Sequence, residues 1–157
     1  MNLLDHWHPV LLSNELKGGP ALARACGEEI VVFRSGEGVG ALPNRCAHRG
    51  MPLHRGHVAH GRVVCPYHGW RWSPDGTATT PGASSARACG AHYHAVDRMG
   101  AVWVKNPASA AAFPRVDFDG FYEFNRSRHR AKAPVELVVD NFIEVEHTPS
   151  VHAVLGY

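Results

Sequence analysis

Two short segments of the sequence each carry one cysteine and one histidine at a spacing suited to metal binding. The first is Cys46-x-His48 and the second is Cys65-x-x-His68, and sixteen residues separate His48 from Cys65. Thiolate sulfur and imidazole nitrogen are ligands for both zinc and iron in proteins. Two cysteines and two histidines can hold a tetrahedral zinc ion, so a structural zinc site is the first chemistry to consider.

The way the ligands are shared between the two segments favours a binuclear iron–sulfur centre over zinc. A structural zinc site usually draws like ligands from one short turn, whereas here each segment supplies one sulfur and one nitrogen. In a two-iron cluster, one iron can take both thiolates and the other both imidazoles. Neutral imidazoles make such a cluster less anionic than an all-cysteine one, which places its reduction potential at roughly −150 to +300 mV.

The residues around and between the two pairs have simpler expected roles. Gly50 and Gly69 each follow a ligand pair, and a residue without a Cβ atom lets a loop adopt positive φ or lets backbone N–H groups approach the cluster. Three further histidines, His54, His57 and His60, lie between the pairs. We expect them to belong to an exposed excursion of the chain, outside the metal site.

A second group of candidate ligands lies near the C-terminus, at Asp140, Glu144, His147 and His152. The first three would share one face of a helix, because they are spaced by four and three residues. Two histidines and a carboxylate with open coordination positions suit mononuclear non-haem Fe(II) and O₂ activation. Taken alone, the pattern does not decide for a metal site, and His147 and His152 as ordinary helix-end and loop residues is the simpler interpretation.

Hydrophobic patterning up to about residue 105 indicates short strands joined by tight turns, as in a small antiparallel barrel or sandwich. The strands are predicted at 28–33, 39–44, 61–65 and 69–72, with hairpins around 73–77 and over 93–106. The fold class expected is therefore mainly β.

The C-terminal third of the sequence has a different character. Residues 106–114 are small and Pro-bounded, as in a linker, and residues 125–134 carry a basic run. This run is either a solvated connector or a docking patch for an acidic redox partner. From Pro134 apolar residues recur at spacings of three and four, which predicts an amphipathic helix that breaks at Pro149.

Composition excludes several other classes of protein. The formal net charge of the 157 residues is +2, and no basic stripe interleaved with aromatics argues for nucleic-acid binding. The N-terminal residues do not resemble a leader peptide, and no apolar run reaches the ~18 residues needed to span a bilayer, so a soluble cytoplasmic protein is expected. In a reducing compartment Cys26 and Cys89 are expected to be free thiols.

The stretch "CAHRG…CPYHGWRW" resembles the Rieske [2Fe–2S] motif, in the form found in ring-hydroxylating and related oxygenases. The resemblance covers roughly residues 5–108. It implies a small antiparallel β domain in which Cys46 and Cys65 bind one iron and His48 and His68 bind the other. Respiratory Rieske proteins carry a serine where this chain has Trp70, and loss of that hydroxyl donor predicts a potential near the low end of the range.

The C-terminal group resembles the start of the catalytic domain of Rieske oxygenases. The resemblance implies that His147 and His152 bind the mononuclear iron and that Glu144 is a carboxylate bridging to the Rieske histidine of a neighbouring subunit, with Asp140 as support. The family more often has aspartate at the Glu144 position, so the geometry of the bridge is left open. The family's third iron ligand would lie beyond Tyr157. The expected organisation is a Rieske domain over residues 1–112, followed by a linker and the first helix of a truncated α+β catalytic domain over 113–157.

The family resemblance implies an oxygenase component that takes electrons from a ferredoxin or flavin reductase onto a [2Fe–2S] cluster. The electrons would pass to mononuclear Fe(II), which activates O₂ to hydroxylate or demethylate a small organic substrate, and the expected assembly is a homotrimer. This chain alone would hold the cluster without turning over. The alternative is a Rieske-type ferredoxin that only carries electrons, and a structural zinc module is the third option.

Overall fold

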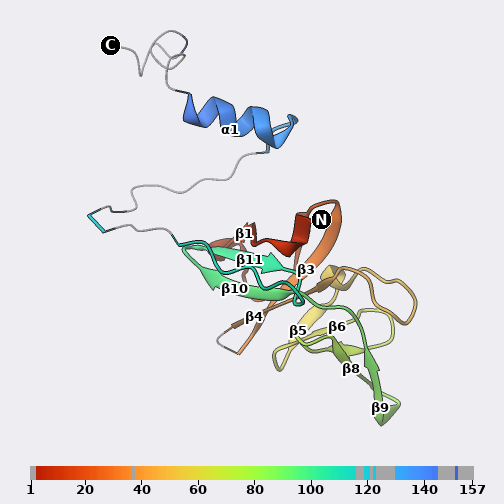
Figure 1. The fold of residues 1–157 in the computed structure, drawn as a ribbon. Coiled ribbons are helices and arrows are strands. Elements are labelled where there is room, and N and C mark those ends of the chain that lie inside the picture. The colour runs from red at the N-terminus through yellow and green to blue at the C-terminus, as the bar shows by residue number, and fades with distance from the viewer. Residues whose placement is uncertain are drawn as a thin grey trace. The chain divides into compact units, whose positions relative to one another are not determined.

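The computed structural model describes residues 3–36, 38–115, 119–120, 122, 130–144 and 151, with the backbone alone at 3 and 83–87. The chain forms two compact units, Met1–Asp117 and Phe118–Tyr157. The first unit holds all of the described strands and the second holds the described α-helix (Figure 1). The predicted domain boundary at residue 112 stays a prediction.

The first unit contains three antiparallel sheets. One sheet has the order β1 (His8–Leu12), β11 (Ala101–Lys105), β10 (His94–Arg98). The central sheet has the order β2 (Ala21–Ala25), β3 (Glu28–Ser35), β4 (Gly38–Pro43). The third sheet runs β5 (His57–Ala59), β6 (Arg62–Val64), β7 (Arg71–Trp72), β8 (Thr77–Thr80), β9 (Ala83–Cys89). Short 3-10 turns lie at Leu3–Asp5, Ser13–Glu15 and Leu53–Arg55. The predicted mainly β fold is confirmed.

Strand β3 separates two hydrophobic cores and contributes to both. Ile30 and Val32 pack with residues of β1 and β11 on one side, and Val31 and Phe33 pack on the other side with residues of the third sheet and its loops. All four side chains are fully buried. Successive side chains of a strand point to opposite faces, so an unbroken apolar run is what a strand between two cores requires.

Several predicted strands and turns are confirmed. Residues 28–33 lie within β3, and 93–106 form the β10–β11 hairpin, whose turn contains Met99 and Gly100 at positive φ. In the 73–77 turn, the Asp75 carboxylate accepts hydrogen bonds from the N–H and hydroxyl of Thr77. These two donors lower the pKa of Asp75. Such side-chain acceptance is typical of Asp in turns.

The segment that carries His54, His57 and His60 is not an excursion, so that expectation was wrong. Leu53 is buried at 1% exposure, and β5 pairs with β6. His57 and His60 are exposed, whereas His54 is half-buried. The segment is held because Leu53 enters the core next to the two cysteine loops.

The linker predicted at 106–114 also proves to be packed on the first unit. Lys105 Nζ donates to the carbonyls of Ser109 (2.6 Å) and Ala111 (2.9 Å). The Phe113 ring meets the rings of Trp7 and Trp103 edge-on, at centroid distances of 5.4 and 5.2 Å. This segment of small residues therefore lies against the sheet, because two of its carbonyl groups accept hydrogen bonds from Lys105 and its Phe113 ring contacts two tryptophan rings.

In the second unit, helix α1 runs over Val135–Ile143. The predicted start after Pro134 is confirmed, but the predicted break at Pro149 is wrong, because Glu144 already has extended backbone angles (φ −82°, ψ 125°). Asp140 and Glu144 place negative charge at the C-terminal end, and the last turn has no basic residue. Both features disfavour continuation, since the C-terminus of a helix dipole is itself negative.

The side chains of α1 are exposed, except that of Val138, which is half-buried. Phe142 and Ile143 are 81% and 71% exposed, and no residue of the helix is buried. Over the part of the chain that is described, we find no helix with the length and apolar character needed to cross a bilayer.

Candidate metal centre

The two cysteine loops have the same backbone hydrogen bonds. In each, the cysteine N–H donates to the carbonyl five residues later, and the glycine N–H four residues later donates back to the cysteine carbonyl. The cysteine N–H bonds are Cys46 to Met51 at 2.9 Å and Cys65 to Trp70 at 2.8 Å, and the returning bonds are Gly50 to Cys46 at 2.8 Å and Gly69 to Cys65 at 3.0 Å. The two loops thus have equal size and hold their cysteines at equivalent positions, whereas the histidine lies two residues after the cysteine in the first loop and three after it in the second.

Glycine is needed at both loop positions. Gly50 and Gly69 have φ of +70° and +68°, in the left-handed region that L side chains rarely adopt. A Cβ atom would also lie 3.1 Å from Arg45 Nε in the first loop and 3.1 Å from Pro81 Cγ in the second. The expectation of positive φ at these glycines is confirmed.

The two cysteines lie together at the buried end of the candidate site. Cys46 and Cys65 are 2% and 3% exposed and belong to the core that includes Val31 and Phe33. Burial raises the pKa of the Cys46 thiol, and the neighbouring Cys65 raises it further. A metal ion bound to the sulfurs would supply the positive charge that thiolates need in this apolar position.

The two histidines lie together at the exposed end. The rings of His48 and His68 have centroids 4.7 Å apart, and both residues are exposed. The Trp70 ring stacks on His48 at 4.9 Å with an interplanar angle of 12°, and the Tyr67 ring stacks on His68 at 3.8 Å. Aromatic neighbours therefore restrict the orientation of both imidazoles while leaving them open to solvent.

This pairing, sulfur with sulfur and imidazole with imidazole, fits a two-iron cluster with one pair on each iron. Within the described ranges, no three His, Cys, Asp or Glu side chains converge in the manner of ligands to one metal ion. The buried indole N–H of Trp72, in the same core as Cys46 and Cys65, has no hydrogen-bond partner in the described chain. An unused donor beside the sulfurs also fits a sulfur-rich cofactor.

Asn44 connects the first cysteine loop to its surroundings. The residue is 5% exposed, its Nδ2 donates to Glu29 Oε2 at 3.2 Å, and its Oδ1 accepts the backbone N–H of His54 at 2.9 Å. Hydrogen bonds donated by Arg24 and Asn44 lower the pKa of the Glu29 carboxyl. Asn44 therefore links β3, the cysteine loop and the segment that begins at Leu53.

We expect Asn44→Ala to lower the free energy of unfolding by about 2 kcal/mol, because the partly buried His54 N–H loses its acceptor. Chemical denaturation followed by circular dichroism measures this loss. Arg24→Ala is the matched control, since it removes the other donor to Glu29 from an exposed position and should change the midpoint far less. Equal destabilisation by the two substitutions would contradict the role of Asn44.

The second group of candidate ligands is placed only in part. Asp140 lies in the last turn of α1, and the backbone N–H of Glu144 donates to the Asp140 carbonyl at 2.9 Å. His147 and His152 lie outside the described residues. Asp140 thus lies in the last turn of α1 and Glu144 is the extended residue that follows it, so the predicted helical face does not continue through Glu144, and the two histidines stay a prediction.

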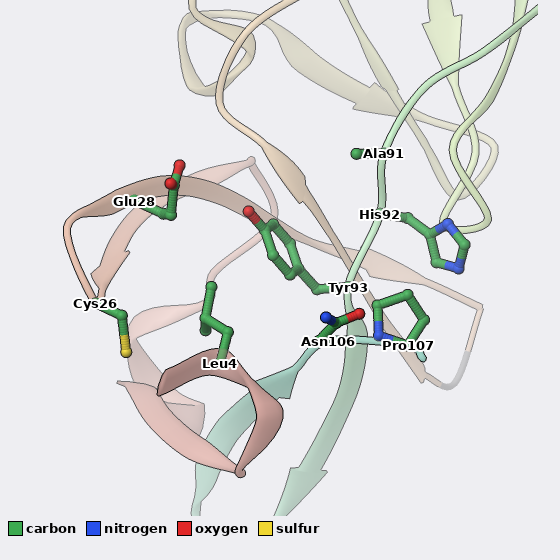
Figure 2. A pocket seen from close by; sticks show the side chains of 8 residues that line it. All are labelled: Leu4, Cys26, Glu28, Ala91, His92, Tyr93, Asn106 and Pro107. Atoms are coloured by element: carbon green, nitrogen blue, oxygen red, sulfur yellow. The ribbon is translucent and has the colours of Figure 1, made fainter. Parts of the chain in front are cut away.

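A pocket of about 400 Å³ lies in the first unit, away from the cysteine loops. It is lined by Leu4, Cys26, Glu28, Ala91, His92, Tyr93, Asn106 and Pro107 (Figure 2). Burial, followed by the charge of Glu28, raises the pKa of the Tyr93 hydroxyl. None of the four ligand candidates lines this pocket, so it is separate from the candidate metal centre.

Comparison with known proteins decides the family. A family model described as "Rieske [2Fe-2S] domain" matches residues 6–89. The chain belongs to the Rieske family. A Rieske-type [2Fe–2S] cluster is therefore its cofactor, and the resemblance inferred from the two motifs is confirmed.

Relatives of the Rieske chain include subunits of oxygenases. Chlorophyllide a oxygenase of Oryza sativa subsp. japonica is 33% identical over 96% of this chain and 29% of its own length. The vanillate O-demethylase oxygenase subunit of Pseudomonas sp. HR199 is 28% identical over 94% of this chain and 44% of its own. A structure of dicamba monooxygenase with non-heme iron and dicamba has a TM-score of 0.64 at 27% identity, over 76% of this chain and 39% of that one. The chain thus spans less than half the length of these relatives.

The motifs located the Rieske loops but missed three contacts around them. Tyr67 and Trp70 stack on the imidazoles, and an aromatic residue beside each ligand was a signal that could have indicated this. Trp70 and Trp72 alternate about Arg71, and this alternation predicted a strand. It did not indicate that the indole N–H of Trp72 is buried in the core that contains the two cysteines. The Asn44–His54 bond spans ten residues, and nothing in the local pattern pointed to it.

Proposed function

We propose that Cys46 and Cys65 bind one iron of the Rieske cluster and that His48 and His68 bind the other. The observation that carries this proposal is the division of the site into two buried, adjacent cysteines and two exposed imidazoles with centroids 4.7 Å apart. The bound cluster supplies a one-electron store. The apolar core shields the sulfur end, and the exposed imidazoles are the side from which an electron enters and leaves.

The chain acts as part of an oxygenase component of a Rieske-type mono- or dioxygenase. A ferredoxin or flavin reductase donates the electrons, and the acceptor is a mononuclear non-haem iron centre that uses O₂ on a small organic substrate. Its relatives are named as oxygenases, a demethylase subunit and a monooxygenase, which supports this class. Arg45 and Arg49 are exposed neighbours of Cys46 and His48 in the chain, and Arg71, three residues after His68, is exposed as well; these charges favour a donor with an acidic surface.

His147 and His152 are the ligands that this chain contributes to the mononuclear iron. Glu144 is the carboxylate that links this centre to the Rieske histidine of a neighbouring subunit in a homotrimer, and Asp140 supports it. The spacing of four residues between Asp140, in the last turn of α1, and Glu144, directly after it, supports the idea that the two carboxylates work as a pair. The alternative function is a Rieske ferredoxin, for which this C-terminal group has no use.

Iron content and electron paramagnetic resonance test the proposed function. The protein should bind about two irons with matching sulfide and give the rhombic signal of a reduced Rieske cluster. Where further iron is bound, His147→Ala should remove it and leave the cluster signal intact. Retention of all iron in that variant would favour the electron carrier, and one zinc ion per chain without a signal would contradict both functions.

A further inference from the structure

The pocket lined by Glu28 and Tyr93 has no role in the metal centre. Its volume of about 400 Å³ lies within the range of about 300–1,000 Å³ that small-molecule sites usually have. The backbone N–H of Tyr93 donates to the Ala41 carbonyl at 2.9 Å, and that of Asn106 donates to the Leu4 carbonyl at 2.7 Å. Backbone hydrogen bonds therefore hold the segments that form its walls.

Two polar side chains of the pocket are available to a ligand. The Asn106 amide is already used, because its Nδ2 donates to Asp5 Oδ1 at 3.2 Å and its Oδ1 accepts the backbone N–H of Ala108 at 3.0 Å. The Glu28 carboxylate and the Tyr93 hydroxyl have no hydrogen bond or ion pair with the other described residues. The hydroxyl points toward the side of the pocket where Glu28 lies (Figure 2).

The charges around the pocket favour a cationic ligand. Among the described residues that line it, Glu28 is the one carboxylate, and none is a lysine or an arginine. His92 is the lining residue that can carry positive charge, and that charge helps to lower the pKa of Asp75, a carboxylate that does not line the pocket. Leu4 and the Tyr93 ring supply apolar surface. A carboxylate beside an aromatic ring and an aliphatic side chain suits a cation that carries an apolar group.

We propose that this pocket binds a small organic amine, whose ammonium group donates hydrogen bonds to the Glu28 carboxylate and the Tyr93 hydroxyl. The apolar part of the amine lies against Leu4 and Pro107. Burial and the charge of Glu28 raise the pKa of Tyr93, so the hydroxyl keeps its proton and its oxygen accepts a hydrogen bond as a neutral group. None of the cluster ligands lines the pocket, so this site is independent of the proposed electron transfer.

Calorimetric titration of the cluster-loaded chain at neutral pH with three compounds of similar size tests the ligand class. The compounds are 2-phenylethylamine, which is cationic, 2-phenylethanol, which is uncharged, and 3-phenylpropanoate, which is anionic. We expect the amine to bind about fivefold more tightly than the alcohol, as one partly exposed ion pair allows, and the carboxylate to bind most weakly because Glu28 repels it. Equal affinity for the three compounds, or no binding of the amine, would overturn the proposal.

Substitutions in the pocket test the two polar contacts. Glu28→Gln should weaken binding of 2-phenylethylamine about fivefold, and Tyr93→Phe should weaken it about threefold, because a neutral hydrogen bond is lost. Glu136→Gln is the matched control, since it removes the same charge from an exposed residue that does not line the pocket, and it should leave the affinity unchanged. An unchanged affinity in Glu28→Gln would contradict the assignment of the site.

A second measurement locates the amine in the unsubstituted protein. In protein with ¹³C-labelled tyrosine rings, nuclear magnetic resonance should show the Tyr93 signals, assigned by their loss in Tyr93→Phe, shifting as 2-phenylethylamine is added. The signals of Tyr122, which does not line the pocket, should stay in place. Binding without a shift at Tyr93 would place the amine elsewhere on the protein and overturn the proposal.

Discussion

Cys46→Ala is expected to abolish cluster binding, with bound iron falling from about two atoms per chain to nearly none. The substitution removes one of the two sulfurs at the buried end of the site, and no other described cysteine lies in that core. A single thiolate from Cys65 cannot complete the coordination of its iron. The visible colour, the iron content and the resonance signal of the reduced protein should all be lost together.

Cys89→Ser is the matched control for this experiment. Cys89 is an exposed free cysteine at the end of β9, and its neighbour in contact is the Gly90 carbonyl. Iron content and resonance signal should equal those of the unchanged protein. If Cys46→Ala kept the cluster, or if Cys89→Ser lost it, the ligand assignment would be wrong.

The fold could be predicted from sequence where local pattern and tertiary environment agree. The unbroken apolar run of β3 already requires burial on both faces, and the structure places a core on each side of it. The turn at Asp75 and the β10–β11 hairpin carry their own turn residues. In each case the information is contained within a few neighbouring residues.

Prediction failed where distant contacts decide the conformation. The segment at 106–114 has the composition of a linker, but Lys105 and the rings of Trp7 and Trp103 hold it on the sheet. The segment around His54 is drawn in by Leu53 and Asn44. No periodicity indicates such contacts, because each depends on a surface built by other elements.

The same distinction applies to the metal centre. Motif spacing identified the candidate ligands of the cluster, since short loops hold them at a set separation along the chain. It could not show that the cysteines are buried and the histidines exposed, because that asymmetry arises when β3 packs beneath the loops. Nor could it show that the Trp72 indole N–H is buried with no hydrogen-bond partner among the described residues, because its burial depends on how Trp72 packs in the core.

Gly56→Ala is expected to destabilise the Rieske unit severely. A Cβ atom on Gly56 would lie 1.9 Å from the Val64 carbonyl oxygen, 3.0 Å from its carbonyl carbon and 3.2 Å from the Leu53 carbonyl oxygen. All three atoms belong to backbone, so no side chain can move to make room. Val64 precedes Cys65 and pairs with His57 and Arg71, so a displaced β6 would also displace the second cysteine loop.

We expect a loss of about 3 kcal/mol or more in the free energy of unfolding, together with reduced iron loading. Denaturant titration and iron content measure the two effects. Gly82→Ala is the control, since a Cβ atom there has nothing within 4 Å and its φ lies outside the left-handed region, and it should shift stability by no more than about 0.5 kcal/mol. The cause is close backbone approach rather than φ, because Gly56 has φ −85°. Gly56→Ser should therefore lower the free energy of unfolding as much as Gly56→Ala does. If Gly56→Ser kept the stability and iron content of the unchanged protein, the predicted displacement of β6 and of the second cysteine loop would be wrong.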